Sequence, residues 1–139
     1  MYQNGQILRD QLRTLSYGYP IAVADDLEYC IVGKFLLPPG YNARETEVLI
    51  YLPRDYPLSP PGIDNAQVFV RPRLRFHGCR LKDVHENCTP DWTDDFCWLC
   101  YRWIDWDPSH DNLVTFTEML RADLSNAEIR IHRRRGYDD

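Results

Sequence analysis

The stretch that most constrains the fold is "EVLIYLPRDYPLSPP" at residues 47–61. Its first half is rich in β-branched and aromatic residues, which is typical of a β-strand. The stretch contains four of the chain's ten prolines, all at or after residue 53. Each proline fixes φ and lacks a backbone N–H. The strand is therefore expected to end near Pro53. The loop after it is expected to keep one shape with little ordering entropy.

Two more stretches resemble strands, "LEYCIVGKFLL" at 27–37 and "AQVFVRPRLRF" at 66–76. Pro72 confines the end of the second stretch to a sheet edge or a bulge. The links between 27–37, 46–53 and 66–76 are short, which favours an antiparallel meander over parallel crossovers.

Helices are predicted before and after this meander, at 6–15 and 111–124. The first has an apolar stripe at i, i+4 and i+7, and the second begins after Asp111, a plausible N-cap. The order helix, meander, irregular segment, helix predicts an α+β fold with the helices packed on one face of the sheet. The two apolar stripes consist of Leu8, Leu12 and Leu15, and of Leu113, Phe116, Leu120 and Leu124.

Length and composition limit the classes of protein to consider. A chain of 139 residues, 44% hydrophobic, suits a single domain spanning 1–139. A net charge of -5 does not indicate a nucleic-acid binder, and the basic run at 130–135 is interpreted as part of a solvated tail, 126–139. No apolar run is long enough for a membrane span, and the first residues lack a signal-peptide pattern. We therefore expect a cytoplasmic protein, in which five cysteines do not indicate a disulfide framework.

The segment from 78 to 107 has no regular pattern, yet it contains four of the five cysteines and all four tryptophans. A long irregular stretch inside a compact domain is normally functional. The functional site is therefore expected in this segment.

Three motifs in this order resemble the ubiquitin-conjugating enzyme family. "YPLSPP" (56–61) is similar to the family's Tyr-Pro-x-x-Pro-Pro stretch after the second strand of the meander, and "WDP" (106–108) to its Trp-x-Pro before a helix. "FLLPPGYNARETEVLIYLPRDYP" (35–57) is similar to the bacterial branch of the superfamily. The resemblance covers about residues 6–125 and implies the ubiquitin-conjugating fold, in which the proline-rich loop supports the active-site side of the sheet.

The resemblance also implies an activity and partners. A protein of this family accepts a ubiquitin-like protein from an activating enzyme as a cysteine thioester and transfers it to an amine or another nucleophile, without a cofactor. The bacterial proteins occur beside activating-like enzymes, ubiquitin-like proteins and isopeptidases, in pathways that include antiphage defence. In the family the first helix docks on the activating enzyme, which draws attention to Arg9 and Arg13 on the predicted helix.

The family's nucleophilic cysteine lies shortly before Trp-x-Pro, and "FCWLCYRWIDWDP" offers two. The sequence context favours Cys100, which lies between apolar Leu99 and Tyr101. Cys97 is the alternative nucleophile, and Cys88 is a third. Each could instead be a buried small hydrophobic residue.

The family's His-Pro-Asn motif, whose Asn supports the oxyanion, is absent. The matching stretch is "FHGC", so only His77 carries over and the oxyanion donor is unknown. "VHENC" (84–88) offers His85 and Asn87 as substitutes. His85 could depress the pKa of a thiol or deprotonate the incoming nucleophile, or it could be a solvated loop histidine.

Two other functions stay open. One is a zinc-stabilised binding module, although only Cys97-x2-Cys100 has the spacing of a zinc knuckle. The other is a catalytically inactive protein of this fold that only binds its partners. The candidate zinc ligands are Cys79, Cys88, Cys97 and Cys100, with His77 and His85 as substitutes.

Overall fold

The computed structural model describes residues 5–62, 68–100 and 105–126. Its ten elements are two helices and eight strands: α1 (Gly5–Leu15), β1 (Ile21–Val23), β2 (Tyr29–Leu36), β3 (Glu45–Tyr51), β4 (Val68–Val70), β5 (Arg75–Phe76), β6 (Cys79–Arg80), β7 (Val84–His85), β8 (Cys97–Leu99) and α2 (Leu113–Ser125).

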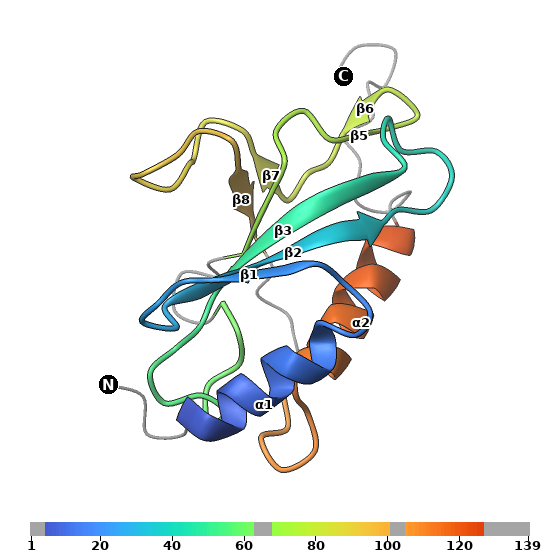
Figure 1. The fold of residues 1–139 in the computed structure, drawn as a ribbon. Coiled ribbons are helices and arrows are strands. Elements are labelled where there is room, and N and C mark those ends of the chain that lie inside the picture. The colour runs from blue at the N-terminus through green and yellow to red at the C-terminus, as the bar shows by residue number, and fades with distance from the viewer. Residues whose placement is uncertain (1–4, 63–67, 101–104, 127–139) are drawn as a thin grey trace.

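Six strands form one antiparallel sheet in the order β1-β2-β3-β4-β8-β7. Both helices lie on the same side of this sheet (Figure 1). The α+β class, the antiparallel meander and the two helices predicted from the sequence are confirmed. None of the helices among the described residues has the length and apolar character needed to cross a membrane.

The third predicted strand, 66–76, is wrong in its extent. Of its described residues, only Val68–Val70 joins the main sheet, and the chain turns before Arg75–Phe76 pairs with β6 in a separate two-stranded sheet. Pro72 supplies no backbone N–H to the ladder, and Arg73 takes a positive φ of 64°, which ends the extended conformation. Residues 66 and 67 lie outside the described part.

The segment 78–107 is more regular than its sequence indicates. It contains β6, β7 and β8, and β8 pairs with β4, so that Val70 lies opposite Cys97 and Phe69 opposite Trp98. Strands of two or three residues that pair with distant partners leave no periodic pattern in the sequence. The candidate cysteines before Trp106 therefore lie in and directly after a strand of the main sheet.

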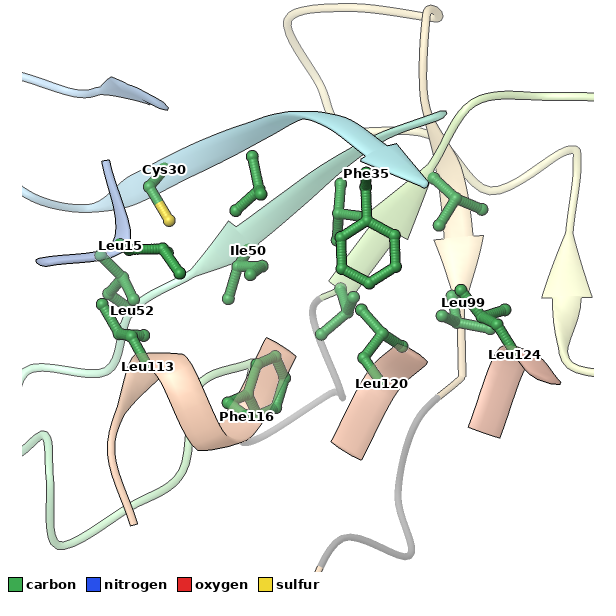
Figure 2. Packing of buried hydrophobic residues seen from close by; sticks show 14 of the residues in the cluster. Leu15, Cys30, Phe35, Ile50, Leu52, Leu99, Leu113, Phe116, Leu120 and Leu124 are labelled. Carbon is green, nitrogen blue, oxygen red and sulfur yellow. The ribbon is translucent and has the colours of Figure 1, made fainter. Parts of the chain in front are cut away.

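The sheet is buried on both faces at its centre. Val48 and Ile50 of β3 belong to the main core under the helices, while Leu49 between them belongs to a smaller cluster on the opposite face. Alternation along the strand explains this division, and it explains why "VLI" shows no polar positions. Figure 2 shows Phe116 and Leu120 of α2 on the helix side of the sheet, among the side chains of the main core.

Helix α2 begins at Leu113, and its N-cap lies one position later than the sequence predicts. Asn112 is the N-cap in place of Asp111, and its side chain accepts hydrogen bonds from the N–H groups of Val114 and Thr115. Thr115 completes a capping box by accepting the N–H of Asn112. Asp111 instead accepts the N–H of Asp107 at 2.8 Å and stabilises the turn before the helix.

The proline-rich loop joins three parts of the chain. Tyr56 is 1% exposed, and its hydroxyl donates to the side-chain oxygen of Gln11 in α1. The same oxygen accepts the N–H of Leu113 at the start of α2 at 3.1 Å. The indole of Trp106 donates to the carbonyl of Pro57 at 2.7 Å, and its ring lies 5.9 Å from that of Tyr56. The rigid loop thus holds both helices and the Trp-x-Pro segment in place.

Candidate functional site

Cys100 directly follows β8 and continues its pairing with β7. Its backbone N–H donates to the carbonyl of Asp83 at 2.8 Å, one position beyond the Val84–Leu99 pair. Side chains alternate along a strand, so Cys100 falls on the face of Trp98, opposite to Leu99 in the main core. Cys100 is half-buried. The thiol is therefore near an edge of the sheet and outside its packed core.

Cys97 lies inside the main core. Its thiol is fully buried and lies 3.8 Å from the carbonyl oxygen of Arg71. Burial raises the pKa of Cys97 from 9.0 to about 12. A buried thiol that stays protonated can neither reach a macromolecular substrate nor attack as a thiolate. Cys97 therefore behaves as a core residue in this conformation.

The remaining cysteines have distinct environments. Cys88 is exposed, and its thiol lies 3.7 Å from the side-chain oxygen of Asn87. Cys79 is half-buried, with its thiol 3.8 Å from the carbonyl of His77. Cys30 is buried in β2, and burial raises its pKa to about 12. Among the described cysteines, accessibility is thus confined to Cys79, Cys88 and Cys100.

His85 lies on the strand next to the candidate thiol. It pairs with Trp98 across β7 and β8, with ring centroids 4.8 Å apart. The register makes His85 a diagonal neighbour of Cys100 on the same face of the sheet, and the Cα atoms of such neighbours lie about 7–8 Å apart. An imidazole at that separation can act on an incoming nucleophile through one water molecule.

His77 belongs to a tight hairpin instead. His77 and Gly78 both take positive φ, 49° and 77°, in the two-residue turn between β5 and β6. The N–H of His77 donates to the carbonyl of Gly40 at 2.7 Å, and its ring contacts Phe76. The stretch "FHGC", which the resemblance aligned with the His-Pro-Asn motif, is thus a structural turn that contains no asparagine.

The candidate zinc ligands do not converge in the described residues. No three His, Cys, Asp or Glu side chains of these ranges form a group that could hold a metal ion. The two cysteines of the CxxC pair do not converge because residues three apart on a strand point to opposite faces. Cys97 faces the core, and Cys100 faces the other side.

A Ser-His-Asp cluster that the sequence analysis missed lies before α2. Asp107 contacts His110 Nδ1 at 2.8 Å, and Ser109 Oγ contacts the same nitrogen at 3.0 Å. A catalytic triad needs the two partners on different ring nitrogens. All three residues are exposed, and hydrogen bonds from Ser109 and His110 hold the pKa of Asp107 below its usual value. The cluster shapes the turn before the helix and is not a nucleophilic site.

The face of the sheet away from the helices is aromatic, which the sequence analysis also missed. Trp92 stacks on Tyr29 with centroids 5.0 Å apart and donates to the hydroxyl of Tyr51 at 2.9 Å. The segment that precedes β8 is thereby held against β2 and β3. The aromatic content of 13% was the available signal, although it does not say on which face the rings lie.

Thiol alkylation tests this arrangement without any partner. With iodoacetamide at pH 8, we expect Cys88 to react fastest and Cys100 more slowly, while Cys30 and Cys97 stay protected until the protein is unfolded. The rise of the Cys97 pKa from 9.0 to about 12 lowers its thiolate fraction by roughly a thousandfold. Peptide mapping by mass spectrometry measures each rate. Labelling of native Cys97 as fast as Cys88 would show that the strand β8 opens readily or is placed differently.

A scan against protein-family models gave no match for this chain, and searches of curated proteins and of solved structures gave none either.

Proposed function

We propose that this protein is a ubiquitin-conjugating-like transferase that carries a ubiquitin-like protein as a thioester on Cys100. The observation that supports it best concerns the two cysteines before Trp106. One of them, Cys97, is sealed in the core with a raised pKa, and the other, Cys100, lies outside it. The three motifs that resemble the family stand around this position in the family's order.

The packing of these motifs adds support. The indole of Trp106 bonds to the carbonyl of Pro57, so the Trp-x-Pro segment and the proline-rich loop meet in the folded chain. Both flank the helix α2, whose first N–H groups are satisfied by Gln11 and Asn112. Trp106 and the start of α2 are therefore held in place by these bonds, and a site for a macromolecular thioester requires such a fixed scaffold.

The chemistry assigned to Cys100 has two steps. Its thiolate attacks the thioester carbonyl presented by an activating enzyme, and the enzyme's cysteine departs as a thiolate. An amine then attacks the new thioester, an amide forms, and Cys100 departs as a thiolate. His85 is the residue we propose as the base that takes the proton from the attacking amine.

The proposal names partners that can be tested. They are an activating-like enzyme and a ubiquitin-like protein, sought first among the products of neighbouring genes, with an isopeptidase in the same pathway. Mixing the first two with ATP and this protein should give an adduct that reducing thiols release. A complex without an adduct would instead favour the inactive binding protein, which the missing His-Pro-Asn motif supports.

Helix α1 provides a test of the activating-enzyme interface. Arg9 and Arg13 are both exposed on α1, four residues apart. We expect the double variant Arg9→Glu, Arg13→Glu to slow charging of the Cys100 thiol by about tenfold or more. If the arginines bind acidic groups of the activating enzyme, the glutamates bring like charges together there and suppress association. The exposed pair between Arg13 and Asp10 contributes little, so thermal stability should change slightly. Charging is followed by non-reducing gel electrophoresis.

A matched control reverses one exposed arginine elsewhere. Arg44→Glu, in the link between β2 and β3, should leave the charging rate unchanged. If the double variant charges like wild type, α1 is not part of the interface.

A further inference from the structure

Lysine is rare in this chain, and one of its two lysines directly precedes the residue whose carbonyl bonds to the N–H of Cys100. The chain has Lys34 and Lys82 against fourteen arginines. Arginine stays protonated in proteins and does not act as a nucleophile, whereas a lysine amine does. Lysines are therefore the side chains of this protein that could accept an acyl group from a thioester as a stable amide.

Lys82 is next to the residue that bonds to Cys100. The N–H of Cys100 donates to the carbonyl of Asp83 at 2.8 Å, and Lys82 is the preceding residue. Hydrogen-bonded partners of antiparallel strands have Cα atoms about 5.5 Å apart, and adjacent Cα atoms are 3.8 Å apart, so the Cα atoms of Lys82 and Cys100 lie within about 9 Å. The four-carbon stem of lysine and the methylene of cysteine together cover such a gap.

The local backbone leaves the Lys82 side chain accessible. Lys82 and Asp83 are the central residues of a turn in which the N–H of Val84 donates to the carbonyl of Leu81 at 3.3 Å. Leu81 and Val84 are buried and anchor this turn in the core, while Lys82 is exposed. The Lys82 side chain is thus exposed on a turn whose two ends are buried.

Lys34 offers a contrast within the same molecule. It is exposed at the irregular point of β2, where the register with β3 shifts. Strands β3 and β4 lie between β2 and β8, so Lys34 is three strand spacings from β8, or about 14 Å. Without large movement it cannot reach an acyl group on Cys100.

We infer that Lys82 is an intramolecular acceptor, to which the acyl group carried by Cys100 is transferred in the same chain. The inference rests on the proposed function of Cys100. In this step the neutral Lys82 amine attacks the thioester carbonyl, an amide C–N bond forms and the C–S bond breaks. The amine proton passes to the departing Cys100 thiolate. The product is a chain modified on Lys82 with its thiol regenerated.

The test uses a small acyl donor, so that no partner protein is needed. Full-length protein is incubated with the 2-mercaptoethanesulfonate thioester of N-acetylglycine, and each residue's acylation is followed by peptide mapping. We expect a hydroxylamine-sensitive acyl group on Cys100, followed by a resistant amide on Lys82. Proximity should favour Lys82 over Lys34 by about tenfold or more.

Variants separate transfer from direct acylation by the donor. Cys100→Ala and Cys100→Ser should lower Lys82 acylation to the level of Lys34, and Lys82→Arg should lengthen the lifetime of the Cys100 thioester. Lys34→Arg is the matched control and should change neither. Acylation of Lys82 no faster than Lys34, or unaffected by the Cys100 variants, would overturn the inference while the Cys100 thioester stands. Absence of any acyl group on Cys100 would overturn the proposed function and the inference together.

Discussion

Replacing Cys100 with serine is expected to turn a thiol-labile adduct into a thiol-resistant one. With the activating enzyme, ATP and the ubiquitin-like protein, wild type should form a thioester that reducing thiols release. The serine hydroxyl keeps a weaker nucleophile at nearly the same place, so the variant should form a more persistent oxyester. Transfer to amines should fall by about a thousandfold or more, because a hydroxyl is a weaker nucleophile than a thiolate and an alkoxide is a poorer leaving group. Gel electrophoresis with and without reducing agent measures both effects.

Two other cysteines provide the controls. Cys88→Ser changes an exposed thiol on the adjoining segment and should leave the adduct thiol-labile. Cys97→Ala is the suitable change in the core, since a serine there would bury a hydroxyl at a cost of about 1–3 kcal/mol. It too should leave the adduct intact. If a folded Cys97→Ala protein forms no adduct while Cys100→Ser still forms a thiol-labile one, the nucleophile is Cys97.

Truncating Tyr56 is expected to have the largest effect on stability. Its ring is 1% exposed and packs on Trp106, and its hydroxyl donates to Gln11. Tyr56→Ala removes this ring from the junction of α1, the loop and α2, and should lower the free energy of unfolding by about 3–5 kcal/mol. Urea unfolding followed by tryptophan fluorescence measures the change.

Two further substitutions separate the contribution of the buried ring to stability from that of the hydroxyl. Tyr56→Phe keeps the ring and loses the hydroxyl, which should cost about 1–2 kcal/mol. Tyr17→Ala removes a tyrosine that is 82% exposed, and should change stability by less than about 0.5 kcal/mol. A Tyr56→Ala protein as stable as the Tyr17→Ala protein would refute the role given to the proline-rich loop.

The elements that the sequence predicts well are those with long local patterns. β2, β3, α1 and α2 each have enough residues for a period of two or 3.6 to show, and the structure places them within a few residues of the prediction. The N-cap moved from Asp111 to Asn112 because both residue types are good caps, and only the tertiary contacts decide between them.

The elements that the sequence misses depend on distant contacts. β8 has three residues, and it exists because β4 on one side and β7 on the other supply hydrogen-bond partners. Once β8 is known as a strand, alternation places Cys97 and Cys100 on opposite faces, whereas the sequence context favoured Cys100 and left Cys97 as an alternative. The proximity of Lys82 to Cys100 follows from the same pairing, and so it was also out of reach of the sequence.

Tandem mass spectrometry of the charged wild-type protein identifies the residue that carries the acyl group. The protein is charged with its activating enzyme, ATP and ubiquitin-like protein, quenched in acid without reducing agent, and digested. We predict a remnant of the ubiquitin-like C-terminus on the peptide that contains Cys100, lost after treatment with a reducing thiol. A remnant on Cys88 or Cys97, with Cys100 unmodified, would contradict the account.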